Sequence, residues 1–124
     1  MKTNPVIILG MHRSGTTILS YILKSMGLFL GKDLNIHHES KFFIEFNNYI
    51  LSISHASWDY PLSAENLFKS KISYEETIKE LNTKINSIQF IRKYWDLNRV
   101  LFNNIDKNFW GWKDLRTTIT FLFF

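Results

Sequence analysis

A loop near the N-terminus, residues 10–17, carries the side chains with the clearest chemical potential: Gly-Met-His-Arg-Ser-Gly-Thr-Thr. It follows an apolar run at residues 5–9 and precedes a helical pattern at residues 15–26. A glycine-bounded loop between a strand and a helix can hold an anion on its backbone N–H groups, and the positive end of the helix dipole adds to this attraction. The loop therefore predicts a phosphate or sulfate site.

The position of the cation separates this loop from a Walker A loop. A Walker A loop carries Lys directly after its second glycine, but here Thr16 follows Gly15, and the cation is Arg13. A guanidinium can form a forked, charge-assisted hydrogen bond to phosphate or sulfate. Hydroxyl groups beside the first N–H groups of the helix offer further donors. We expect the anion to be bound by His12, Arg13, Ser14, Gly15, Thr16 and Thr17.

The apolar pattern also predicts the elements that hold this loop. The β-branched run at 5–9 is typical of a buried strand. The helix at 15–26 should end at Gly27, which suits the position after a helix C-terminus. A second helix is expected at 39–54, because its apolar residues fall on one face.

The second half of the chain is expected to be mainly helical. Residues 73–105 form the longest periodic stretch, with Ser73 as its predicted N-cap and a kink or break near Arg92. A short strand is predicted at 109–113, and a last helix begins at about residue 117.

These elements predict an α/β fold, a three-layer P-loop-like sandwich with a parallel sheet. Two strands alone are marginal in water, so the sheet is expected to need further strands. Four of the last six residues are Leu or Phe, and the end of the chain has no helix stop signal. We therefore expect residues 1–124 to form one domain that is truncated on its C-terminal side.

Composition limits the class of protein further. Hydrophobic residues make up 45% of the 124 residues, which is enough for a core, and there is no Cys. No apolar run approaches the roughly 18 residues of a membrane span, and the run at 6–9 is too short for a signal peptide. We expect a cytoplasmic protein. The net charge of +4 is spread along the chain, so nucleic acid is not a predicted partner.

Several segments resemble one family in the same order along the chain. Residues 10–17 are similar to the 5′-phosphosulfate-binding loop of sulfotransferases that use PAPS (3′-phosphoadenosine-5′-phosphosulfate), where Lys or Arg precedes Ser-Gly-Thr-Thr. Residues 110–118, WGWKDLRTT, resemble a second family block that usually reads WGWKDPR. Between them, segments 42–47 and 58–61 are similar to an aromatic-Glu-Asn segment and a Trp-x-x-Pro turn of bacterial members.

The resemblance implies an activity and roles for single residues. A sulfuryl group would pass from PAPS to an acceptor hydroxyl of a sugar, a lipid or a peptide, with carbohydrate as the preferred acceptor class. Arg13 and Lys113 would be the catalytic cations, with no metal required. The general base would be Glu45, with Glu39 as the second choice.

Two departures from the family pattern accompany the resemblance. Leu115 replaces the usual Pro, and residues 1–124 contain no counterpart of the family's 3′-phosphate-binding segment. Two alternatives stay open: an atypical P-loop kinase or NTPase, which would bind Mg-ATP, and a truncated, non-catalytic fragment. His37 and His38 lack further ligands nearby in sequence and are not predicted to bind a metal.

Overall fold

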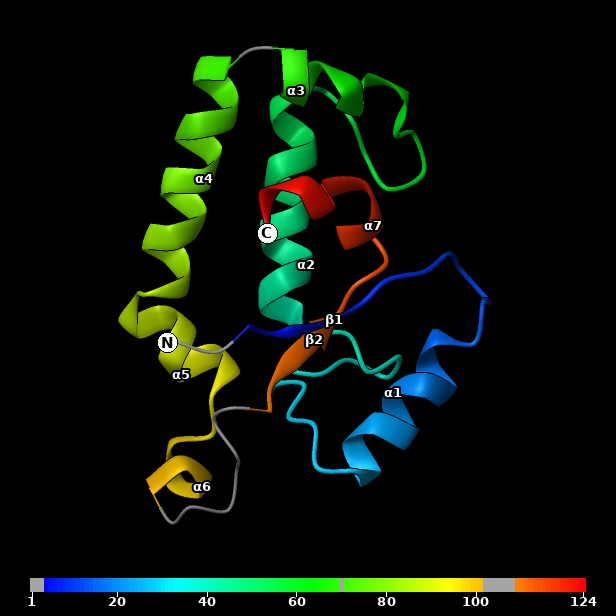
Figure 1. Cartoon of the computed structure of the whole chain (residues 1–124), viewed down its shortest axis with the longest axis vertical. Helices are drawn as coiled ribbons and strands as arrows, with labels where there is room; N and C mark the ends of the chain where they lie inside the picture. Colours follow the sequence, from blue (N-terminus) through cyan, green and yellow to red (C-terminus); the bar gives the residue numbers. More distant parts are fainter. Residues whose placement is uncertain (1–3, 70, 102–108) are drawn as a thin grey trace.

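Two short strands from opposite ends of the chain meet in a parallel sheet near the middle of the molecule (Figure 1). The computed structural model describes residues 4–69, 71–101 and 109–124. Strand β1 (Val6–Ile8) pairs with β2 (Gly111–Lys113), and Ile8 lies opposite Lys113. Among the described residues, helices surround this small sheet, so the fold is mixed α/β. Both predicted strands and their parallel relation are confirmed, although each strand is shorter than expected.

The glycine at the start of β2, Gly111, suits its place between two other segments. On one side a β-carbon at Gly111 would lie 1.8 Å from the Val6 carbonyl oxygen, so a larger residue would separate the strands. On the other side, Gly111 donates its N–H to the Phe29 carbonyl at 2.9 Å. Leu28 and Leu30 flank this contact and are buried against Ile8.

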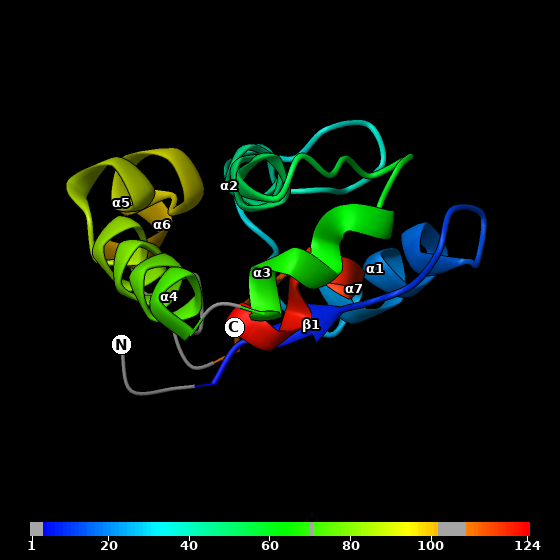
Figure 2. The same ribbon diagram turned by 90° about the horizontal axis from the view of Figure 1, so that it is seen from above.

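The two helices predicted in the first half of the chain are present. Helix α1 spans Thr16–Ser25, and helix α2 spans Lys41–Ile53. Helix α2 carries much of the core, because the ring of Phe43 stacks on Trp112 of β2 with centroids 3.9 Å apart. Figure 2 shows α4 and α5 on one side of the molecule and α1 on the other, with α2 and the sheet between them.

The long periodic stretch is divided at two places, one before and one after the predicted position near Arg92. Helix α4 (Lys71–Ile85) is followed by α5 (Ile88–Tyr94) and α6 (Leu97–Leu101). The first break lies before Arg92, because the hydroxyl of Ser87 accepts the Phe90 N–H at 3.1 Å and starts a new helix. Ser73 lies inside α4 rather than at its cap. The predicted residues 102–105 lie outside the described part of the chain.

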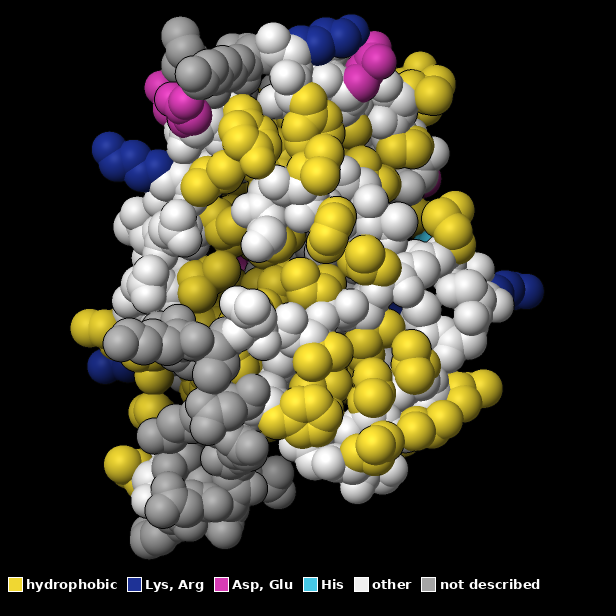
Figure 3. Space-filling view, viewed as in Figure 1, with side chains coloured by type: hydrophobic (Ala, Val, Ile, Leu, Met, Phe, Trp, Pro, Cys, Tyr) yellow, Lys and Arg dark blue, Asp and Glu magenta, His cyan; other side chains and the backbone are white. Residues whose placement is uncertain are grey.

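Further short helices complete the fold. A 3₁₀ turn (Leu62–Glu65) and α3 (Asn66–Lys69) were not predicted from the sequence. The expected last helix is α7 (Thr117–Thr120), which tightens into a 3₁₀ turn (Phe121–Phe123). Hydrophobic side chains gather near the C-terminal residues and over α1 on the face drawn in Figure 3. A groove of about 750 Å³ lies between α4, α5 and the C-terminal residues.

Candidate functional site

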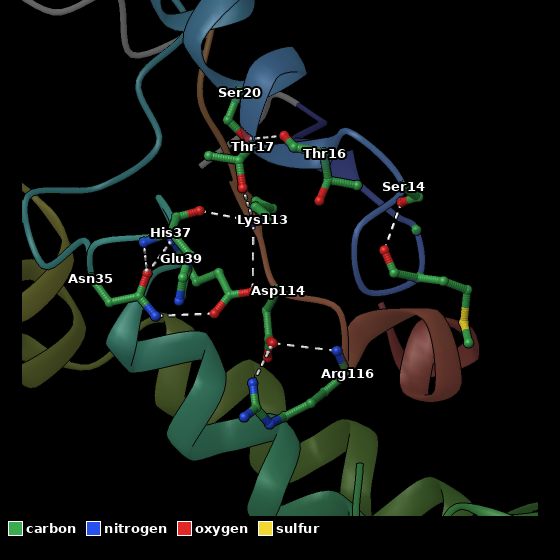
Figure 4. A network of polar contacts seen from close by, with 12 residues as sticks. Ser14, Thr16, Thr17, Ser20, Asn35, His37, Glu39, Lys113, Asp114 and Arg116 are labelled. Atoms are coloured by element: carbon green, nitrogen blue, oxygen red, sulfur yellow. Dashed lines mark hydrogen bonds and ion pairs between the residues drawn. The ribbon is translucent and has the colours of Figure 1, made fainter. Parts of the chain in front are cut away.

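The carboxyl ends of the two parallel strands bring the anion loop and Lys113 to one edge of the sheet. The loop leaves β1 after Ile8, and Lys113 is the last residue of β2. Open α/β sheets bind ligands at this edge, outside the ends of the strands. Figure 4 shows that side chains from both halves of the chain meet here.

The ammonium group of Lys113 lies at the centre of this meeting point. The side chain is 2% exposed, and its Nζ donates to the Thr17 hydroxyl at 3.1 Å and to the His37 carbonyl at 2.8 Å. A carboxylate oxygen of Glu39 lies 3.7 Å away. A buried ammonium needs such partners, because burial without them is costly. The ion pair and hydrogen bonds thus hold a positive charge beside the first turn of α1.

Glu39 is positioned by a turn that precedes α2. The side-chain oxygen of Asn35 accepts the backbone N–H groups of His37 and Glu39, both at 2.9 Å. The Asn35 amide in turn donates to the Glu39 carboxylate at 3.0 Å. An Asx turn of this kind fixes the local backbone. The carboxylate is therefore aimed at Lys113 and stays largely buried.

The loop between β1 and α1 turns sharply before the first residue of α1. Gly15 has φ of +85° and directly precedes α1, a left-handed conformation that favours glycine. Ser14 donates both its N–H and its hydroxyl to the Met11 carbonyl, at 3.2 and 2.6 Å. By helix geometry the first N–H groups of α1 have no acceptor within the helix. Thr16 is buried at this point, while the hydroxyl of Thr17 faces Lys113.

Arg13 is the exposed cation of this loop. Its φ is +59°, and within the described residues its guanidinium forms no hydrogen bond or ion pair. Gly10, at the start of the loop, donates its N–H to the Thr118 hydroxyl, which donates back to the Gly10 carbonyl, each at 3.1 Å. The loop is thus attached to α7, while Arg13 is available to a ligand.

The segment after Lys113 is anchored by a buried polar network. Asp114 accepts a hydrogen bond from the Arg116 guanidinium at 2.7 Å and from the Asn47 amide at 2.8 Å. Asn47 also accepts from the Thr120 hydroxyl at 2.5 Å. Because Asn47 belongs to α2, the network links the end of β2 to the central helix. The network therefore holds the segment after Lys113 in place.

Two predicted site residues lie apart from this cluster. Glu45 is exposed on α2 and pairs with Lys93 of α5 at 2.9 Å, so it does not contact Lys113. The core face of α2 carries Phe42 and Phe46, which turns Glu45 away from the sheet. His12 is exposed, and its ring lies 5.0 Å from that of Trp58. The structure thus brings Glu39, the second choice, to the cation in place of Glu45.

Positive charge also affects His38, next to the Lys113 contacts. Burial, and then the charges of Lys24 and Lys113, lower the pKa of His38 below its usual value. Its ring lies 4.0 Å from Tyr21 of α1. Within the described ranges, no three His, Asp or Glu side chains are grouped to hold a metal ion.

Comparison with known proteins identified no relative of this chain. No protein-family model, curated protein or solved structure matches the chain. Among the helices in the described part of the chain, none has the length and apolar character needed to cross a membrane.

Proposed function

We propose that this chain binds the 5′-phosphosulfate of PAPS and takes part in sulfuryl transfer to an acceptor hydroxyl. The observation that carries the proposal is the contact between Lys113 and Thr17, which joins the second motif to the anion loop. The finer fold that accompanies it is a P-loop-like three-layer sandwich, with the β1 and β2 pair as part of its parallel sheet. The proposal includes the expected cytoplasmic location.

Charge neutralisation is the main contribution of the site to this reaction. The backbone N–H groups at the start of α1 would hold the phosphosulfate, and Arg13 would form a forked hydrogen bond to it. Lys113 would stabilise the charge that develops on the bridging oxygen as the sulfur–oxygen bond breaks. Its own contacts to Thr17 and Glu39 hold it in place before the substrate arrives.

Proton removal is assigned to Glu39. The acceptor oxygen forms a bond to sulfur, and its proton passes to the Glu39 carboxylate. The bridging oxygen leaves with the electron pair of the broken bond, as the 5′-phosphate of the nucleotide product. Glu39 suits this role because it contacts the cation of the site, whereas Glu45 pairs with Lys93 elsewhere.

Calorimetric titration with the product nucleotide, adenosine 3′,5′-bisphosphate (PAP), tests the binding part of the proposal. We expect Arg13→Ala to weaken PAP binding about tenfold or more, the effect of losing a charge-assisted hydrogen bond. Arg92→Ala is the matched control, because Arg92 is also an exposed arginine but lies on α5. The control should bind PAP as the wild type does.

Two results would contradict this assignment. Equal PAP affinity in the Arg13→Ala and wild-type chains would remove Arg13 from the site. Preference for Mg-ATP over PAP in a competition titration would favour a nucleotide triphosphate enzyme instead.

A further inference from the structure

A small pocket adjoins the anion loop on the side of Trp58. Its volume is about 150 Å³, and the loop residues Gly10, Met11 and His12 form one side of it. The remaining walls come from the Trp58–Pro61 turn, from the segment after β2 and from Glu39. Residues far apart in the sequence thus build one concave surface next to the proposed phosphosulfate site.

Glu39 connects this pocket with the reaction centre. Glu39 is one of the residues that line the pocket, and its carboxylate lies 3.7 Å from the ammonium of Lys113. Each carboxylate oxygen has lone pairs beyond those used by Lys113 and Asn35. A hydroxyl group inside the pocket would therefore lie beside both the proposed base and the loop that holds the sulfuryl donor.

The walls of the pocket are mainly apolar. Trp58 is half exposed, and with Pro61, Leu115 and Ile119 it provides apolar surface. A cavity of about this size with apolar walls is large enough for one six-membered ring. The ring of His12, which also lines the pocket, packs edge-on against the Trp58 ring and extends this aromatic surface.

Few polar groups of the pocket are free to bind a ligand. The Thr118 hydroxyl is engaged with the N–H and carbonyl of Gly10. The Arg116 guanidinium is bonded to Asp114 through Nη1, so of these two side chains only the buried Nε of Arg116 is a donor without a partner within the described residues. A sugar ring carries hydroxyls around its whole edge, and most would lose water here without gaining a protein partner. An aromatic ring with one hydroxyl avoids this desolvation cost, because its single hydroxyl can donate to Glu39.

We propose that this pocket binds a phenolic acceptor, with the aromatic ring against Trp58 and the hydroxyl at Glu39. The assignment of the ring as acceptor rests on the proposed function above. The phenolic oxygen would bond to sulfur as its proton moves to Glu39, and the 5′-phosphate of the donor would leave with the electron pair. This choice differs from the carbohydrate class implied by the family resemblance.

An NMR titration of the PAP-saturated chain tests the pocket. Phenol and methyl glucoside are added separately, and the Trp58 indole and Gly10 amide resonances are followed. We expect phenol to shift both signals. Trp58→Ala should weaken phenol binding about tenfold, as measured at Gly10, because an aromatic contact is lost. Trp58→Phe should restore most of the affinity, since it keeps a ring.

Tyr60→Ala is the matched control, because Tyr60 is an exposed aromatic residue of the same turn that does not line the pocket. It should leave phenol binding unchanged. Shifts with methyl glucoside but not phenol would overturn the phenolic class. Normal PAP binding with no shift from either probe would overturn the pocket and leave the proposed function standing. Phenol shifts without any PAP binding would support the ring site and contradict the proposed function.

Discussion

The ammonium of Lys113 lies 3.1 Å from the hydroxyl of Thr17, across a sequence separation of 96 residues. This contact joins the end of β2 to the first turn of α1, and with it the two motifs that carry the chemistry. It also explains why Lys113 is buried rather than solvated, since Thr17, Glu39 and the His37 carbonyl replace water around it. The same contacts should therefore support both stability and catalysis.

Replacing Lys113 with Met should destabilise the fold, because Glu39 would be left as a buried carboxylate without its cation. Loss of one partner from a buried ion pair costs about 3–5 kcal/mol in unfolding free energy. The double variant Lys113→Met/Glu39→Gln should lose less than the sum of the two single variants, because it leaves no unpaired charge. Urea denaturation of the four chains measures this coupling. Additive losses would show that the two side chains do not interact.

The two glutamates should differ in their effect on sulfuryl transfer. Glu39→Gln should lower kcat about 10²–10³-fold, the usual contribution of a general base, with PAP affinity retained. Glu45→Gln is the matched control and should change the rate little, because only its surface ion pair with Lys93 is lost. Steady-state rates with PAPS and phenol measure both. A slow Glu45 variant beside a normal Glu39 variant would reverse the assignment.

The elements that hold the loop could be predicted because their signals are local. Each signal can be recognised from a few neighbouring residues: the apolar run of β1, the glycine after α1 and the apolar face of α2. The division of residues 71–101 into separate helices is harder to predict from the sequence. Ile85 and Ile88 continue the apolar spacing across the break between α4 and α5, so periodicity alone favours a continuous helix there.

The position of Glu39 beside Lys113 could not be predicted from the sequence. The apolar face of α2 places Glu45 away from Phe42 and Phe46, whereas the family resemblance favours Glu45 as the base. The approach of Glu39 to Lys113 depends on a turn around Asn35 and on strand pairing far along the chain. The spacing of residues along the sequence does not reveal such long-range contacts.

Gly15→Ala should both destabilise the chain and weaken PAP binding. An L-residue in the left-handed conformation costs about 1–2 kcal/mol, and no neighbour lies within 4 Å of the new β-carbon to add a clash. Gly27→Ala is a matched control, since Gly27 also has a positive φ, of +98°, and open space around it. Both variants should unfold at lower urea concentration. Only Gly15→Ala should reduce PAP affinity in calorimetry, and equal PAP affinities in the two variants would separate Gly15 from the anion site.

The lowered pKa of His38 predicts a loss of stability as the pH falls. The unfolded chain binds the proton at the ordinary value of 6.5, whereas in the folded chain burial, Lys24 and Lys113 shift binding to lower pH. Between these two values the unfolded state holds more protons, so the free energy of unfolding decreases as pH decreases below 6.5. Above that value His38 is neutral in both states and contributes no slope.

Thermal melts between about pH 5.5 and pH 7.5 isolate this effect, because carboxylates with ordinary or lowered pKa values titrate mainly below that range. His38→Asn should reduce the fall in Tm over the acidic half of the range, and Asn tolerates the positive φ of this position. His55→Asn is the matched control, because His55 has nearly the same φ and is exposed. Its pH dependence should follow the wild type. An unchanged slope in His38→Asn would mean that His38 is not the group that links protonation to folding in this range.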